Sequence, residues 1–239
     1  MYSNIKVVAM DLDGTLTNHK TPLTEENKQA LIKLSKKYKL LMVGAGQVER
    51  IFNQLNKFPL DVIGNYGMQY GEYDKDTDCI KIVKNYSLGC DRESVSKRVQ
   101  ALREKYGFTE YKGESVEFHP SGVVTFAILG TKAEQKDKLA FDPDRKKRRA
   151  IYKEVCEVFS DYVVFVGGSS SFDMAPRPYD KKYALEVYCA EHGLTLDQVA
   201  YVGDDYGEGG NDESVYKSNA KYFKIDDFRD FPKVIEPLL

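Results

Sequence analysis

The sequence predicts an α/β protein: a doubly wound parallel sheet with an α+β domain inserted into it. Short apolar segments alternate with helical stretches in the first third of the chain and again in the last quarter. This alternation is typical of βαβ units with helices on both faces of a sheet. Between these regions, strand-like segments follow one another with few helices, which indicates antiparallel pairing. A chain of 239 residues is long enough for both parts.

Four segments predict the parallel sheet. Each is short and aliphatic or β-branched, as expected of a strand buried on both faces: 5–10, 40–43, 61–63 and 199–202. Apolar residues at helical spacing follow the first two segments. The first helix is expected to begin at Thr24, which precedes two glutamates and so resembles a helix N-terminus. Another helix is expected from Lys181, before the last of these strands.

The alternation changes near Tyr70. Strand-like segments then occur at 79–83, 115–118, 123–129, 162–166 and 171–175. One helix is expected over 91–106, and another from Asp142-Pro143, where a capping residue precedes a proline in the first turn. The sequence therefore predicts two domains, a core formed by 1–82 and 177–239 and an α+β insertion over 83–176.

Composition excludes several classes of protein. The formal net charge is -2 with both signs interspersed, so no field attracts nucleic acid or an anionic membrane. The run 145–149 is basic, but its helical context favours a solvated helix face over a nucleic-acid site. No apolar run approaches the roughly 18 residues of a transmembrane helix, and none resembles a signal peptide. The four cysteines are scattered without a CxxC pair, which fits a reducing cytoplasm and argues against structural zinc. We expect a cytoplasmic protein.

The strongest chemical signal is Asp11-Leu12-Asp13-Gly14-Thr15, directly after the first predicted strand. Ligands of open parallel sheets bind beyond the carboxyl ends of the strands, where this motif lies. A carboxylate in that place can act as a nucleophile and form a covalent intermediate. The alternative is a turn with two capping aspartates and a glycine at positive φ.

A second acidic motif, Gly203-Asp204 through Gly210-Asn211-Asp212, follows the last predicted strand. Its four acidic side chains would repel one another in a purely structural loop. A hard divalent cation with oxygen ligands removes that difficulty, and Mg²⁺ is held by few carboxylates. The alternative is a solvated acidic loop.

Two further features could serve phosphate chemistry. Lys181 lies where the chain returns to the α/β core, although lysine is usually a surface residue. The turn Gly44-Ala45-Gly46 precedes a predicted helix, and its backbone N–H groups could hold phosphate oxygens. Such a glycine turn is more often only a turn.

Together, and in this order, these four elements resemble the haloacid dehalogenase (HAD) superfamily of phosphotransferases. The insertion resembles the larger α+β cap of that superfamily. Further motifs, spread over nearly the whole chain, are similar to those of eukaryotic-type phosphomannomutases: Gly167-Gly168, Ser171-Phe172-Asp173, Asp180-Lys181 and Gly209-Gly210-Asn211-Asp212. The resemblance implies a Rossmann-like HAD core and a cap that supplies substrate specificity.

The same resemblance implies roles for the core residues. Asp11 is the nucleophile that becomes an aspartyl phosphate, and Asp13 is the general acid/base. Mg²⁺ is held by Asp11, Asp13 and Asp204, with Asp212 as a further residue of the metal site. Lys181 belongs to the catalytic set.

Asn211 and Lys181 are expected to steady the phosphoryl oxygens, and in the cap Ser171 and Asp173 are expected to contact the sugar. The chain also departs from the family where arginines hold the distal phosphate of the sugar. The side chains at those positions are Lys20, His119, Thr131 and Lys138, and a serine after the second strand is replaced by Gly46. Lysine binds phosphate as a point charge and threonine only weakly, so these replacements weaken the case for a mutase.

The sequence therefore predicts a Mg²⁺-dependent phosphatase acting on a small phosphorylated metabolite, expected to be a sugar phosphate. The alternative is a phosphomannomutase-like isomerase that interconverts mannose 6-phosphate and mannose 1-phosphate. A non-catalytic metabolite-binding sensor is a third hypothesis, which the apparent nucleophile argues against. No nucleic-acid or membrane partner is expected, and a homodimer through the cap is one further hypothesis.

Overall fold

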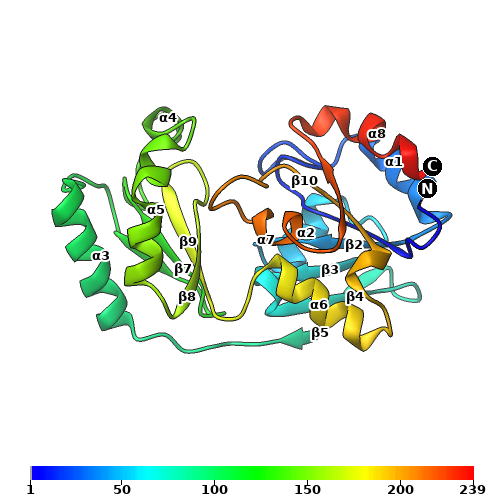
Figure 1. Cartoon of the computed structure of the whole chain (residues 1–239), viewed down its shortest axis with the longest axis horizontal. Helices are drawn as coiled ribbons and strands as arrows, with labels where there is room; N and C mark the ends of the chain where they lie inside the picture. Colours follow the sequence, from blue (N-terminus) through cyan, green and yellow to red (C-terminus); the bar gives the residue numbers. More distant parts are fainter. Residues whose placement is uncertain (1) are drawn as a thin grey trace. The chain divides into compact units, whose positions relative to one another are not determined.

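The computed structural model describes residues 2–239, and every count below refers to them. They divide into two compact units, shown in Figure 1. The first comprises residues up to Tyr86 together with Asp180–Tyr206 and Asp212–Leu239. The second comprises Ser87–Tyr179 and the short segment Gly207–Asn211. The sequence predicts boundaries at 82/83 and 176/177, whereas the chain passes between the units at 86/87 and 179/180.

The first unit contains a seven-stranded sheet in the order β11-β10-β1-β2-β3-β4-β5. The first five strands in this order are parallel, and β4 and β5 are antiparallel to their neighbours. This confirms the predicted doubly wound α/β fold. The strands are β1 (Val7–Met10), β2 (Lys39–Val43), β3 (Asp61–Gly64), β4 (Gln69–Asp74), β5 (Cys79–Asn85), β10 (Val199–Gly203) and β11 (Lys221–Lys224).

Helices cover both faces of this sheet because alternate strand residues point to opposite sides. Val8 and Met10 of β1 pack in one core with helices α1, α2 and α8, whereas Val7 and Ala9 pack in another with α6 and α7. In Figure 1 the C-terminal helix α8 lies beside α1. The helices are α1 (Glu25–Ser35), α2 (Val48–Gln54), α6 (Lys181–Glu191), α7 (Glu213–Tyr216) and α8 (Phe231–Val234). The short 3-10 helices are η1 (Asn65–Gly67), η2 (Leu196–Gln198), η3 (Phe228–Asp230) and η4 (Glu236–Leu238).

The second unit is an antiparallel sheet in the order β6-β7-β9-β8, with helices packed against it in a single core. Its strands are β6 (Val116–Phe118), β7 (Val124–Ala127), β8 (Tyr162–Phe165) and β9 (Ser171–Pro176). Its helices are α3 (Arg92–Tyr106), α4 (Gln135–Phe141) and α5 (Lys146–Val158). Among residues 2–239, no helix is both long and apolar enough to cross a bilayer.

Two predictions for α5 are wrong. The helix begins at Lys146 rather than at Asp142-Pro143, because Arg145 adopts a left-handed conformation with φ +59°. Asp142 still caps the helix: its carboxylate accepts the N–H groups of Lys147 (2.9 Å) and Arg148 (3.1 Å). The basic run is also not a uniformly solvated face, since the Arg148 side chain is 1% exposed.

Candidate active site

Asp11 lies directly beyond β1, and its main-chain N–H donates to the carbonyl of Val202 on β10 (3.0 Å). Its side chain is buried, and Nζ of Lys181 donates to its Oδ1 at 2.6 Å. Burial raises the pKa of Asp11 well above its usual range. The Lys181 ammonium opposes that rise, and two neighbouring carboxylates add to it. The nearby ammonium therefore favours the ionised form of a carboxyl that burial alone would keep neutral.

Lys181 begins α6 and is completely buried. Its ammonium bridges two carboxylates, since Nζ also donates to Oδ1 of Asp212 at 2.8 Å. The Tyr201 hydroxyl donates to the same Oδ1 (2.6 Å), and the main-chain N–H of Asp205 donates to Oδ2 (3.1 Å). Burial by itself would lower the pKa of Lys181, but Asp11 and Asp212 together raise it, so the ammonium stays charged.

Asp204 follows β10 and meets the first motif through two contacts. Thr15 Oγ1 donates to Asp204 Oδ1 at 2.8 Å. Gly14 has φ +99°, and a Cβ at that position would lie 2.6 Å from Asp204 Oδ2. The glycine of the motif thus leaves room for the Asp204 carboxylate, and the threonine hydrogen-bonds to it. Burial, and next the charge of Asp212, raise the pKa of Asp204 to about 6.

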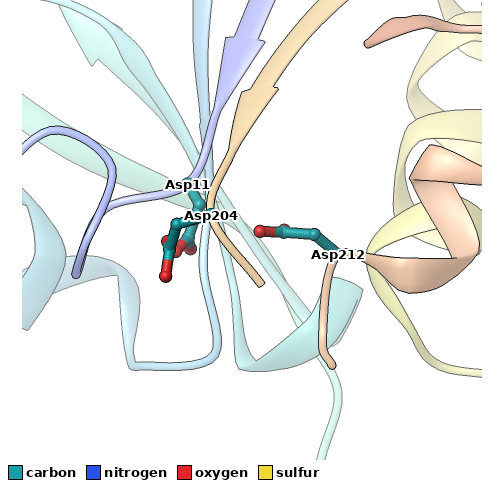
Figure 2. Close-up of side chains that lie close together, drawn as sticks. All are labelled: Asp11, Asp204 and Asp212. Carbon is teal, nitrogen blue, oxygen red and sulfur yellow. The ribbon is translucent and has the colours of Figure 1, made fainter. Parts of the chain in front are cut away.

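Figure 2 shows the carboxylates of Asp11 and Asp204 side by side, with the Asp212 carboxylate directed toward them. One oxygen from each lies within 4.8 Å of the others. Asp11 and Asp212 are buried and Asp204 is partly buried, and their oxygen-only donor set fits a hard divalent cation such as Mg²⁺. Asp212 already accepts three hydrogen bonds, so Asp11 and Asp204 have more lone-pair capacity for a metal.

The Asp13 carboxylate lies apart from these three, facing α2. Its Oδ1 accepts the main-chain N–H of Lys20 and the Gln54 side-chain amide, each at 2.7 Å. Its Oδ2 is 3.6 Å from Nη2 of Arg50. The structure thus does not bring the Asp13 side chain into the carboxylate cluster with which the sequence groups it. Its partly exposed position suits proton exchange with a substrate.

The glycine turn after β2 is partly engaged in the sheet. The N–H of Gly44 donates to the carbonyl of Ile63 on β3 (2.9 Å), which continues the sheet. That N–H is therefore engaged within the sheet, and a phosphate-binding role for Gly44 stays a prediction. Ala45 is partly exposed at the end of β2, so its role stays a prediction.

In the second unit, two of the predicted substrate residues are joined through a third. Thr125 Oγ1 donates to Oδ1 of Asp173 (2.8 Å), and Nε2 of His119 lies 3.3 Å from the same hydroxyl. Burial raises the pKa of Asp173, and the Thr125 hydrogen bond opposes the rise. The Ser171 hydroxyl instead donates to the carbonyl of Gly167 (3.1 Å).

The remaining predicted residues lie elsewhere. Lys138 Nζ donates to the Thr131 carbonyl (3.1 Å), and the Thr131 hydroxyl accepts the N–H of Glu114 (3.0 Å). Lys20 is exposed and has φ +56°. Asn211 ends the segment Gly207–Asn211, which groups with the second unit.

Sequence reasoning missed four residues that touch predicted site residues: Thr125, Tyr201, Gln54 and Arg50. Tyr201 lies within an apolar strand, so its sequence context predicts a core residue and not a site residue. Gln54 and Arg50 lie one turn apart on α2, so both side chains lie on the same face of the helix. That this face is turned toward Asp13 depends on how the helix packs, which the local sequence does not reveal.

Comparison with known proteins shows which families and structures this chain resembles. The model of the eukaryotic phosphomannomutase family matches residues 27–224. A phosphomannomutase from Arabidopsis thaliana is 24% identical over 227 residues, covering 89% of this chain and 87% of that protein. Among solved structures, an IMP-nucleotidase from Plasmodium falciparum superposes with TM-score 0.68 at 14% identity, over 100% of this chain and 71% of the other. A HAD phosphatase from Bacteroides thetaiotaomicron gives 0.63 at 16% identity, over 98% and 94%.

Proposed function

The chain belongs to the eukaryotic phosphomannomutase family, within the HAD superfamily of enzymes, and from that premise we propose that it transfers the phosphoryl group of a sugar phosphate to its own Asp11. The observation that carries the proposal is the buried Lys181 ammonium shared between Asp11 and Asp212, with Asp204 close by. A buried nucleophilic carboxylate beside a fixed cation suits attack on an anionic phosphoryl group.

In the proposed reaction an Asp11 oxygen attacks phosphorus, and the bond from phosphorus to the sugar oxygen breaks. Asp13 gives its proton to that leaving oxygen, which generates the free sugar hydroxyl. Lys181 stabilises the negative charge on the transferring oxygens. Asp11 and Asp204, with Asp212 beside them, would hold Mg²⁺, which when bound neutralises charge on phosphoryl oxygens. In the second half-reaction Asp13 takes a proton from the acceptor as the acceptor attacks the aspartyl phosphate.

The acceptor distinguishes two candidate functions. Family membership and the phosphomannomutase relatives favour the sugar as acceptor, which makes the enzyme a mutase for mannose 1-phosphate and 6-phosphate. This candidate has the better support from the comparisons.

Side chains of the second unit favour water instead. A mutase must retain a bisphosphate intermediate, which calls for strong cationic donors at its distal phosphate. Thr131 uses its hydroxyl for the Glu114 N–H, Lys138 donates to a carbonyl, and His119 is hydrogen-bonded to Thr125. Each charge-assisted hydrogen bond that is missing costs about 1.5–3 kcal/mol, so retention should fall on the order of a hundredfold. We therefore propose phosphate release as the faster outcome.

One assay tests both candidates. Purified protein with Mg²⁺ is given mannose 1-phosphate and a hexose bisphosphate, and inorganic phosphate and mannose 6-phosphate are measured in the same reaction. We expect phosphate release to exceed isomerisation. Isomerisation faster by tenfold or more would establish the mutase instead, and neither product from any sugar phosphate would contradict the proposal as a whole.

A further inference from the structure

The Arg50 guanidinium covers Gly46, at the edge of the sheet where Asp11 and Asp13 also lie. Arg50 is in the first turn of α2, and Gly46 comes three residues after the end of β2. A Cβ on Gly46 would lie 2.3 Å from Nη2 and 2.5 Å from Nε of Arg50. These distances are far below van der Waals contact, so this guanidinium position requires a glycine at 46.

The surroundings of Arg50 do not account for it as a structural residue. Nη1 donates to the side chain of Gln54 (2.9 Å), and Nη2 is 3.6 Å from Oδ2 of Asp13, which is longer than a hydrogen bond. The side chain is 43% exposed. An ion pair this long and this exposed contributes little to folding. Gln54, by contrast, donates to both Asp13 and Thr17, and together with the main-chain N–H of Lys20 it holds the Asp13 carboxylate in place without Arg50.

We propose that Arg50 is a substrate-binding residue that grips the phosphoryl group entering beside Asp13. This rests on the proposed function and adds a residue to its site. A guanidinium presents several N–H groups in one plane and can bind two phosphate oxygens at once. The serine missing at position 46 would have offered only one neutral donor. Here a cation from the neighbouring helix takes up the space that the serine side chain would fill.

The first test measures binding of inorganic phosphate in the presence of Mg²⁺ by calorimetry, which needs no turnover. Relative to the wild type, R50A should weaken phosphate binding by about ten- to a hundredfold, and R50K by less. R229A is the matched control, because Arg229 is an exposed arginine of the same unit that also pairs with an aspartate. R229A should change the dissociation constant by less than about twofold. An R50A constant equal to that of R229A would overturn the inference, as would a wild type that binds no phosphate.

Position 46 offers a second route that does not depend on deleting a charge. G46S should displace the guanidinium and weaken phosphate binding much as R50A does. In the double variant R50A/G46S the added hydroxyl no longer meets a guanidinium, so binding should be no weaker than in R50A alone. Additive losses in the double variant, or unchanged binding in G46S, would overturn the inference. Thermal melts of each variant identify any that has failed to fold.

These outcomes separate the inference from the proposed function. If the wild type turns over no sugar phosphate but R50A still loses phosphate affinity, the proposed function fails and the Arg50 site stands. If sugar phosphates are turned over while R50A and G46S bind phosphate as the wild type does, only the Arg50 site fails.

Discussion

Both units bury cationic side chains, and Lys181 of the first unit differs from Arg148 of the second in what surrounds it. In the first unit, the Lys181 ammonium is shared by two carboxylates, Asp11 and Asp212. In the second, the Arg148 guanidinium pairs with one carboxylate, Asp142 (2.9 Å). Its Nη1 donates to the carbonyls of Gly167 (2.6 Å) and Ser171 (3.0 Å).

The difference indicates different roles for the two buried ion pairs. Arg148 and Asp142 form a neutral pair, and the guanidinium's further donors close the turn that leads into β9. One cation between two carboxylates leaves a net negative charge in a buried place, which a cation such as Mg²⁺ or the polarised phosphoryl group can complement. This difference supports the proposed catalytic role of the Lys181 cluster and indicates a structural role for the Arg148 cluster.

Replacing the nucleophile tests the comparison most severely. Asp11→Asn removes the oxyanion but keeps the size of the side chain, so turnover should fall on the order of a thousandfold or more. The fold should persist, because an amide fits the same space. Steady-state phosphate release and a thermal melt check both statements. Substantial activity in Asp11→Asn would refute covalent transfer to this residue.

Removing each of these two cations in turn sharpens the comparison. Lys181→Met should abolish most activity, since it leaves Asp11 without its cation. Arg148→Met should instead destabilise the second unit by about 3–5 kcal/mol, because Asp142 and several carbonyls lose their partner. Urea unfolding monitored together with activity distinguishes these effects.

Lys182→Ala is the matched control for Lys181→Met, since Lys182 is the next residue and its ion pair with Glu186 is exposed. Its effect on unfolding should stay within about 1 kcal/mol. If Lys181→Met retained activity while Arg148→Met lost it without loss of stability, the assignment of the two clusters would be reversed.

Much of the fold could be predicted because the central strands are buried on both faces and therefore uniformly apolar. β1 and β10 show this pattern without interruption. The prediction missed β11, which lies at the edge of the sheet with exposed lysines at both ends. It also missed α4, which has no buried residue and hence no apolar stripe.

Site residues could be predicted where they belong to a local sequence motif. They could not be predicted where their role depends on contact with another segment of the chain. The D-x-D-G-T motif identifies Asp11 from sequence alone. The structure explains the glycine of the motif, because a side chain at Gly14 would collide with Asp204. Arg148 shows the opposite case. Within a basic run its charge suggested solvent, but its helix position turns it inward toward Asp142, which no local pattern reveals.

Metal-free protein offers a weaker test of the first unit through pH. Asp204 has a pKa of about 6 against a reference of 3.8, so the folded state holds its proton more tightly than the unfolded state. Its contribution to stability is therefore complete below the reference value and is lost as the pH rises through 6. In chelator, the melting temperature of the wild type should fall relative to Asp204→Asn between pH 4.5 and 7.

Added Mg²⁺ should abolish that relative loss, because a bound cation stabilises the ionised carboxylates. If the melting temperatures of the two proteins in chelator changed equally with pH, Asp204 would not be the group whose raised pKa lowers stability.

The smallest effect is expected within the acidic loop, whose members looked alike in sequence. Asp204 presents its carboxylate to Thr15 and to the metal cluster, whereas Glu208 is exposed and contributes its main-chain carbonyl to Nε of Arg149 (3.1 Å). Any side chain at 208 can supply that carbonyl. Glu208→Ala should therefore change the free energy of unfolding by less than about 0.5 kcal/mol and leave the half-saturating Mg²⁺ concentration unchanged. Asp204→Ala should raise that concentration on the order of tenfold or more. Mg²⁺ titrations of activity for both variants make the comparison, and an equal rise in the two would place the Glu208 carboxylate at the metal.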